Sequence, residues 1–153
     1  MTLLSKLDDG RRTHVESRLR TNLMGWFSSV DPEGRPDTVP VWFLWQPDET
    51  ILVYSQPGKP KLANLAANPQ VSLALDVTDI GRDIIRFEGT AGHEPDHPPA
   101  DQVAGYVAKY TERIGAIFGT AADFAATFSA PIVIRPTRAR ISAPSPGATA
   151  GVR

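Results

Sequence analysis

The chain has 153 residues, of which 41% are hydrophobic and 22% charged, proportions that are typical of a single soluble globular domain. Sixteen Lys and Arg residues stand against 17 Asp and Glu residues, and this near-neutral balance argues against nucleic acid as the main partner. Because the sequence contains no cysteine, disulfides, iron–sulfur clusters and thiol catalysis are excluded.

Residues 1–12 are interrupted by charge and do not resemble a signal peptide, and no apolar run approaches the roughly 18 residues that span a bilayer. We therefore expect a cytoplasmic protein with no membrane partner. The 14 prolines and 12 glycines predict many short elements rather than a bundle of long helices.

The first predicted element is a helix over residues 13–23. Thr13 and Glu16 have the spacing of a capping box, and Val15, Leu19 and Leu23 repeat on one helical face. A strand is predicted next at residues 25–30, followed by a turn at residues 31–34, where Pro and Gly stand in turn positions.

The second predicted strand, residues 38–45, carries most of the large aromatic side chains. Alternation puts Phe43 and Trp45 on one face and Trp42 on the other face, together with Pro40 and Leu44. Proline has no N–H for a sheet ladder, so Pro40 predicts an edge strand or a bulge. We expect one of the two aromatic faces to cover a flat ligand or a partner subunit.

The remaining pattern predicts a strand at residues 51–55, a helix at 61–68, strands at 71–76 and 83–93, a helix after residue 99 and a last strand at 132–141. The helix after residue 99 has an apolar stripe of Val103, Val107, Tyr110 and Ile114. Thr120 is expected to cap another short helix. Residues 143–153 have almost nothing to bury and are expected to form a disordered tail. The sum is a mainly β fold with short helices, in which one domain over residues 1–142 closes toward a small antiparallel barrel.

The sequence argues against several kinds of functional site. His93 and His97 lie in a proline-rich turn without the carboxylate spacing of a metal site, so we expect no metal. The sequence also has no G-x-S-x-G, G-x-G-x-x-G or Walker-type motif. Arg138 and Arg140 share one strand face, where they either meet an acidic ligand or guard a solvated edge strand.

The segment after the strand at 51–55 is a candidate anion site. Pro57 and Gly58 force a turn, and a helix then begins beside Lys59 and Lys61. The free amides of a helix N-terminus carry partial positive charge, and two lysines add full charges there. A phosphate would suit this site, although two solvated lysines in a loop would give the same pattern.

The order of the predicted elements and three motifs together resemble one family: G-x-P at 34–36, V-P-V-W-F at 39–43, and S-Q-P-G-K-P-K-L-A-N-L-A-A-N-P-Q-V at 55–71. The chain resembles the pyridoxamine 5'-phosphate oxidase-like split-barrel group over residues 12–141, and within it the actinobacterial flavin/deazaflavin oxidoreductases that use coenzyme F420. The resemblance implies a six-stranded antiparallel split β-barrel of the FMN-binding type. It also implies a homodimer with the cofactor in a groove at the subunit interface.

The resemblance further implies the residues of the cofactor site. Lys59 and Lys61 would hold the cofactor phosphate, flanked by Ser55, Gln56 and Asn64. The ring would be lined by Val39, Pro40, Val41 and Trp42, and it would be covered by the loop of Asp79, Ile80, Gly81 and Arg82.

The expected activity is hydride transfer between coenzyme F420 and a small electron-poor organic acceptor. The sequence contains no evident catalytic dyad, and Tyr110 is a candidate proton donor if it reaches the groove. An FMN-dependent reductase is one alternative, and a protein that binds flavin, deazaflavin or haem without catalysis is another. The arginine-rich C-terminal signature of enzymes that oxidise pyridoxamine phosphate is missing, so that activity is not expected.

Overall fold

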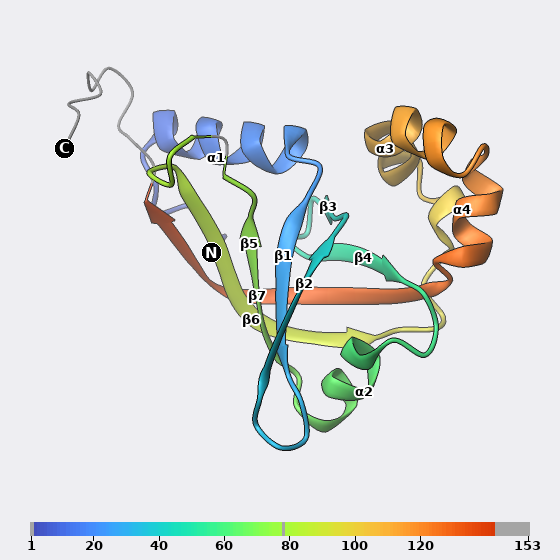
Figure 1. Ribbon diagram of the computed structural model, residues 1–153. Coiled ribbons are helices and arrows are strands. Elements are labelled where there is room, and N and C mark those ends of the chain that lie inside the picture. The colour runs from blue at the N-terminus through green and yellow to red at the C-terminus, as the bar shows by residue number, and fades with distance from the viewer. Residues whose placement is uncertain (1, 78, 143–153) are drawn as a thin grey trace.

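The computed structural model describes residues 2–77 and 79–142, and its centre is one antiparallel sheet in the order β2-β1-β5-β6-β7-β4-β3 (Figure 1). The strands are β1 (Gly25–Val30), β2 (Pro36–Val41), β3 (Leu44–Trp45), β4 (Ile51–Ser55), β5 (Gln70–Leu75), β6 (Ile84–His93) and β7 (Ala130–Ser142). The helices are α1 (Asp9–Thr21), α2 (Pro60–Ala67), α3 (Ala104–Ile117) and α4 (Ala121–Thr127), with a short 3₁₀ turn at Ala100–Gln102. Within the described residues, no helix combines the length and apolarity needed to cross a lipid bilayer.

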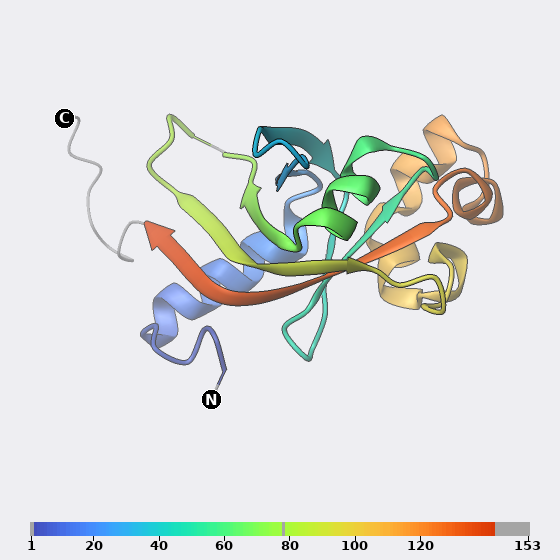
Figure 2. The same cartoon turned by 90° about the horizontal axis from the view of Figure 1, so that it is seen from below.

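The connection between β2 and β3 makes the sheet a split barrel. These two strands form opposite edges of the sheet, yet only Trp42 and Phe43 separate them in the sequence. Three Cα–Cα steps can span at most about 11 Å, so the two edges must come close together. The sheet therefore curls until it nearly closes, as Figures 1 and 2 show.

Two hydrophobic clusters cover the two faces of this curled sheet. The inner cluster fills the barrel and includes Phe27, Phe43 and Leu73, all fully buried. The outer cluster lies between the sheet and the helices α3 and α4. Because both of its faces are covered, every residue of β4 is buried: Val53 belongs to the inner cluster and Leu52 to the outer one.

The predicted strand at 38–45 is wrong in one respect, because it divides into β2 and β3 and raises the count from six strands to seven. At the break, the Phe43 N–H donates to the Tyr110 hydroxyl at 2.7 Å. The Phe43 carbonyl accepts from the Tyr110 hydroxyl and from the Lys109 ammonium, both at 2.9 Å. Side chains of α3 thus satisfy backbone groups that a continuous strand would have paired with a neighbour.

Two helices also differ from the prediction. Helix α1 begins four residues early, because the carboxylate of Asp8 accepts the Arg11 N–H and so caps the helix in place of Thr13. In α3 the buried stripe consists of Tyr106, Tyr110 and Ile114, whereas the expected Val103 and Val107 are only half-buried.

Other predictions are confirmed. The strands at 25–30 and 51–55 have the expected bounds, and Pro40 lies on an edge strand. The Thr120 hydroxyl caps α4 by accepting the Asp123 N–H. Alternation assigned the aromatic side chains correctly, because Phe43 and Trp45 pack with the inner cluster while Trp42 and Leu44 pack with the outer one. The expected tail at 143–153 lies outside the described residues.

Candidate functional site

A cavity of about 240 Å³ lies where α3 and α4 meet β2, β4 and α2. Six of its ten lining residues are aromatic and one, Lys61, is charged; the set is Pro40, Val41, Trp42, Tyr54, Lys61, Tyr106, Ile117, Phe118, Phe124 and Phe128. Ligand pockets are commonly apolar with a few polar groups that fix orientation. This composition suits a planar ring that carries a negative charge or a polar atom.

The aromatic walls are held by stacking among themselves. Trp42 stacks on Tyr110 with ring centroids 4.8 Å apart, and on Phe124 at 5.4 Å. Tyr106 meets Tyr54 edge to face at 5.0 Å and lies 5.8 Å from Phe124. Offset and edge-to-face contacts of this kind each stabilise the packing by about 0.5–1.5 kcal/mol beyond area burial, so the cavity walls are preorganised.

The cation of the site comes from the start of α2. Gly58 adopts a φ of 76°, which allows the sharp turn after β4, and Pro60 then begins the helix. Lys61 is half-buried, and burial together with the charge of Lys59 lowers its pKa, while Asp37 opposes that shift. Among the described residues Lys61 has no ion-pair partner, so its charge is available to an anionic ligand.

The other residues predicted for the phosphate site lie around this helix start but do not line the cavity. Lys59 is exposed and forms the N-cap position of α2, where no side chain caps the helix amides. Ser55 is buried and its hydroxyl donates to the Gln56 carbonyl at 2.8 Å. Asn64 is also buried, and its amide donates to the Ser29 hydroxyl at 3.0 Å, which fixes α2 against β1.

Three of the four residues predicted to line the ring also line this cavity: Pro40 and Val41 at the end of β2, and Trp42 directly after it. Lys61 is part of the same lining. Val39 does not line the cavity and packs against the inner cluster, to which Val41 belongs as well.

The loop of Asp79, Ile80, Gly81 and Arg82 lies elsewhere in the chain. It connects β5 and β6 beside α1, at the opposite end of the sheet from α3 and α4 (Figure 1). The Asp79 carboxylate accepts the N–H groups of Gly81 and Arg82, at 2.9 and 3.1 Å. Within one chain, therefore, this loop is not brought to the cavity.

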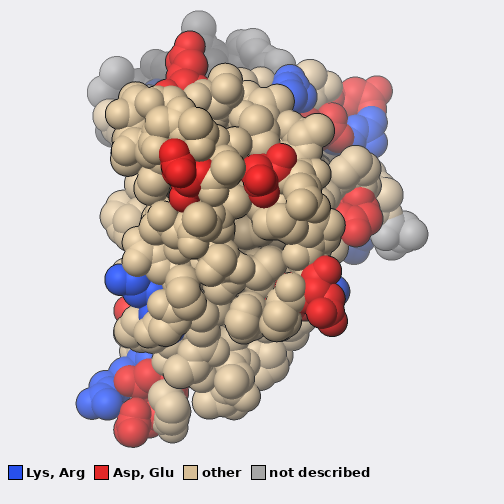
Figure 3. All heavy atoms as spheres, turned by 90° about the vertical axis from the view of Figure 1, so that its right-hand side faces the viewer, with Lys and Arg blue, Asp and Glu red and all other residues tan. Residues whose placement is uncertain are grey.

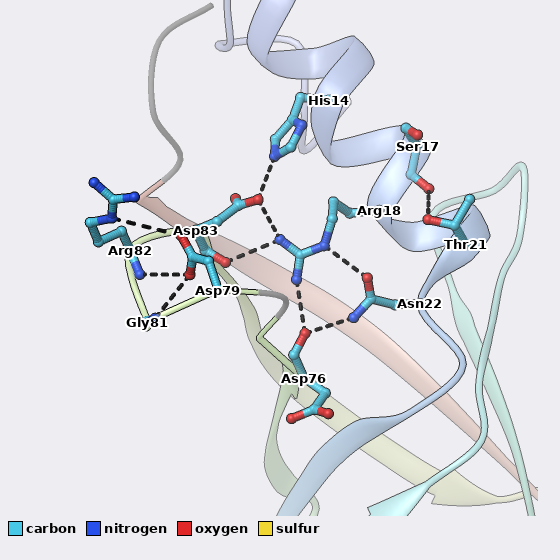
Figure 4. Close-up of polar contacts among 10 residues, drawn as sticks. All are labelled: His14, Ser17, Arg18, Thr21, Asn22, Asp76, Asp79, Gly81, Arg82 and Asp83. Atoms are coloured by element: carbon cyan, nitrogen blue, oxygen red, sulfur yellow. Dashed lines mark hydrogen bonds and ion pairs between the residues drawn. The ribbon is translucent and has the colours of Figure 1, made fainter. Parts of the chain in front are cut away.

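A buried ion-pair network fixes the end of that loop to α1 (Figure 4). The Arg18 guanidinium lies 2.7 Å from the Asp83 carboxylate, and His14 approaches the same carboxylate at 2.7 Å. Arg18 also donates to the carbonyl of Asp76 and to the side-chain oxygen of Asn22. Because Arg18 is almost fully buried, these contacts hold both ends of the loop to one helix.

The arginines of β7 pair within the sheet. Arg140 donates to the Glu88 carboxylate at 2.8 Å, with Arg138 at 3.8 Å from the same group, and Arg135 forms a two-bond ion pair with Glu94. Strand β7 is also interior to the sheet, between β6 and β4, so the alternative that these arginines guard an edge strand is wrong.

Sequence reasoning missed the contribution of α3 and α4 to the site. Tyr106 lines the cavity, is fully buried, and has a hydroxyl with no hydrogen-bond partner among the described residues. Tyr110, the candidate proton donor, does not line the cavity, and its hydroxyl is occupied by backbone groups. The spacing of four between Tyr106, Tyr110 and Ile114 was the sequence signal that could have placed Tyr106 on the buried face.

The side chains present fit a flavin-like or deazaflavin-like ligand better than haem. The aromatic walls match a planar ring, and the half-buried Lys61, which has no ion-pair partner among the described residues, provides a donor for a phosphate. Haem iron takes a His, Cys, Met or, less often, Tyr ligand. In the described part of the chain the cavity lining contains no His, Cys or Met, and burial raises the pKa of its two tyrosines, Tyr54 and Tyr106, which disfavours the phenolate that would bind iron.

Comparison with known proteins gives a family match and a set of similar folds. Residues 12–141 match the family described as pyridoxamine 5'-phosphate oxidase. A solved F420 reductase is 28% identical with a TM-score of 0.63, covering 82% of this chain and 94% of that one. A putative pyridoxamine 5'-phosphate oxidase from Listeria innocua is 21% identical with a TM-score of 0.60, covering 84% and 95%.

The same fold occurs in a protein with a different described role. The haem storage protein HutZ from Vibrio cholerae is 17% identical with a TM-score of 0.60, covering 84% of this chain and 92% of that chain. None of the curated proteins matches the chain in sequence. The comparisons therefore agree on the split-barrel fold.

Proposed function

Because the chain belongs to the pyridoxamine 5'-phosphate oxidase family, we propose that it is an oxidoreductase that binds coenzyme F420 and transfers a hydride to a small electron-poor organic acceptor. The observation that carries this proposal is the half-buried, unpaired Lys61 in a cavity whose walls are aromatic. The similarity to an F420 reductase at 28% identity supports the deazaflavin over other cofactors.

The residues at the start of α2 bind the cofactor phosphate in this proposal. Lys61 provides a partly desolvated charge, and Lys59 adds a second charge at the surface. The first N–H groups of α2, which no side chain caps, add partial positive charge at the same helix start. Asn64 ties α2 to β1 through its bond to the Ser29 hydroxyl. Ser55 and Gln56 precede the turn into the helix, where the Ser55 hydroxyl donates to the Gln56 carbonyl.

The residues of β2 and the helices orient the ring and exclude water. Pro40 and Trp42 provide an apolar surface against which a flat ring can lie. When bound, the reduced deazaflavin supplies the hydride, and the protein supplies position and a dry environment. A protein that only positions the reactants needs no acid or base of its own, which agrees with a cavity lining that contains no carboxylate or imidazole.

The site is completed by a second copy of the chain in this proposal. The cavity, at about 240 Å³, falls below the roughly 300 Å³ at which pockets for whole drug-sized ligands begin. The side of the molecule seen in Figure 3 is covered largely by uncharged residues, with two acidic side chains in its upper part and the other charged side chains toward its margins. A homodimer would bury such a surface and would bring a partner loop over the ligand.

The first experiment is a parallel titration of the protein with F420 and with FMN, followed by tryptophan fluorescence. Trp42 lies in the cavity wall, so a bound ring should quench its emission. Tighter binding of F420 supports the proposal, whereas tighter binding of FMN moves the protein to the alternative of an FMN-dependent reductase. Tight F420 binding without oxidation of the reduced cofactor by any enone or quinone would leave a binding protein and contradict the proposed activity.

A further inference from the structure

A second groove adjoins the aromatic cavity, between the end of α1, the start of β1 and α3. Its volume of about 510 Å³ lies within the range of pockets that bind small molecules. Trp42 lines both the groove and the cavity. On α3, Arg113 lines the groove, and Ile117, one helical turn further on, lines the cavity. The groove, which we call the Arg113 groove, is therefore a separate space that meets the cavity at a shared wall.

Arg113 gives this groove a charge that the protein does not neutralise. Its side chain is exposed and forms no hydrogen bond or ion pair within residues 2–77 and 79–142. Every other arginine in those residues except Arg20 forms an ion pair with a carboxylate. A guanidinium is a planar fork of N–H donors that matches the two oxygens of a carboxylate. Arg113 is thus accessible and has its donors free for an acidic ligand.

The floor of the groove is held in place by hydrogen bonds and does not neutralise Arg113. Arg18 and the side-chain amide of Asn22 both donate to the Asp76 carbonyl, at 2.9 and 2.7 Å (Figure 4). The Asp76 carboxylate, which belongs to the only acidic residue in the described lining, points away from these two side chains. It accepts the indole N–H of Trp26 at 3.3 Å instead. The charge balance of the groove therefore favours an anion.

The walls beside Arg113 are apolar. Leu23 and Met24 are half-buried in the lining, and Val77 is 45% exposed at its edge. A bare inorganic anion would leave these side chains in contact with water, whereas an organic acid would cover them. Pockets of this kind, with an apolar lining and one charged group, fix the orientation of a ligand by its charged end.

We propose that the Arg113 groove binds the carboxylate end of the organic acceptor, and that Arg113 is the residue that selects acidic acceptors. The role of this ligand as a hydride acceptor rests on the proposed function, whereas carboxylate binding in the groove does not. The cavity, at about 240 Å³, is assigned to the cofactor ring, and the larger groove provides separate room beside it. A carboxylate held by Arg113 would direct the conjugated part of the acceptor toward Trp42, where the two spaces meet.

The first test measures ligand binding without any cofactor. The probes are 2-naphthoate and 2-acetonaphthone, which have nearly the same shape and differ in the negative charge. By ligand-observed NMR, Arg113→Gln should weaken 2-naphthoate roughly threefold to tenfold, between the effect of an exposed ion pair and that of a charged hydrogen bond, and should leave 2-acetonaphthone unchanged.

Arg20→Gln is the matched control. Arg20 is also exposed and also has no ion-pair partner among the described residues, but it does not line the Arg113 groove. This variant removes the same charge from the protein and should leave the affinity for both probes unchanged. Both substitutions are at the surface, so the denaturation midpoints should stay close to that of the natural protein.

Four results of this test would overturn the inference. They are no binding of 2-naphthoate to the natural protein, equal weakening of both probes by Arg113→Gln, equal weakening of 2-naphthoate by Arg20→Gln, and weakening by Lys61→Ala but not by Arg113→Gln. The last result would place the carboxylate in the aromatic cavity.

The second test separates this inference from the proposed function. With reduced F420, Arg113→Gln should lower kcat/KM for 3-benzoylacrylate, an enone with a carboxylate, by the same factor of roughly three to ten and leave its methyl ester unchanged. Equal losses for the acid and the ester would overturn the selection of acidic acceptors. If 2-naphthoate depends on Arg113 while F420 fails to bind in the separate titration, the carboxylate groove stands and the proposed function fails.

Discussion

Removing one partner of the buried pair of Arg18 and Asp83 should be one of the most destabilising single changes in the described chain, because it leaves a buried charge without its counter-ion. Asp83→Asn keeps the shape of the side chain and removes its charge, leaving the Arg18 guanidinium, whose side chain is 7% exposed, without a counter-ion. Removing one partner of a buried ion pair costs about 3–5 kcal/mol. Because Arg18 keeps its bonds to the Asp76 carbonyl and to Asn22, we expect the lower end, about 3 kcal/mol.

The assay is a double-mutant cycle in chemical denaturation. For a domain of this size a loss of 3 kcal/mol lowers the melting temperature by roughly 6–12 °C. Arg18→Met should cost a similar amount, and the double variant should cost clearly less than the two single variants added together, because it leaves no unpaired buried charge.

The exposed pair of Arg135 and Glu94 is the matched control. Their side chains are 54% and 37% exposed, so Glu94→Gln should cost no more than about 1 kcal/mol. Strict additivity in the Arg18–Asp83 cycle, or equal losses for Asp83→Asn and Glu94→Gln, would refute the reasoning that burial makes this pair strong.

Two further predictions concern α3 and β6. Burial lowers the pKa of Lys109 to about 7, so between pH 7 and 10.5 the folded protein binds fewer protons than the unfolded chain, and stability should rise with pH. The rise is at most roughly 1.4 kcal/mol per pH unit. Lys109→Met should abolish this rise in urea titrations across that range, and parallel profiles would contradict the assignment. Gly89→Ala should destabilise by roughly 1–3 kcal/mol, because the new Cβ would lie 2.2 Å from the Arg135 carbonyl oxygen. Gly92→Ala, in the same strand with open space around it, is the control, and equal losses would show that the clash is relieved.

Local signals predicted the elements whose partners lie nearby in the sequence. The strands at 25–30 and 51–55 are bounded by turn residues, and their predicted limits are those of β1 and β4. The period of a strand predicted that Trp42 and Phe43 lie on opposite faces. They do so in the structure, although the predicted strand is interrupted at these two residues. Pro40 marked the sheet edge because it lacks an N–H.

The features of the fold and of the site that local signals did not predict depend on contacts between distant segments of the chain. The end of β2 is set by Tyr110 and Lys109, which lie more than sixty residues further along the chain. The missing partner of Tyr106 is a property of the packed helices and has no signature in sequence. The resemblance implied the residues of one cofactor site, but within one chain the fold places the loop at 79–82 at the end of the sheet opposite α3 and α4.

The central claim is that Lys61 in the aromatic cavity binds the cofactor phosphate, and the most direct measurement is the dissociation constant of F420 for Lys61→Ala and Lys59→Ala. A charge-assisted hydrogen bond from the half-buried Lys61 contributes about 1.5–3 kcal/mol, so its loss should weaken binding roughly tenfold to a hundredfold or slightly more. Loss of the exposed Lys59 should weaken binding about fivefold or less. F420 affinity that is unchanged in Lys61→Ala, with the variant folded as judged by its denaturation midpoint, would contradict the claim.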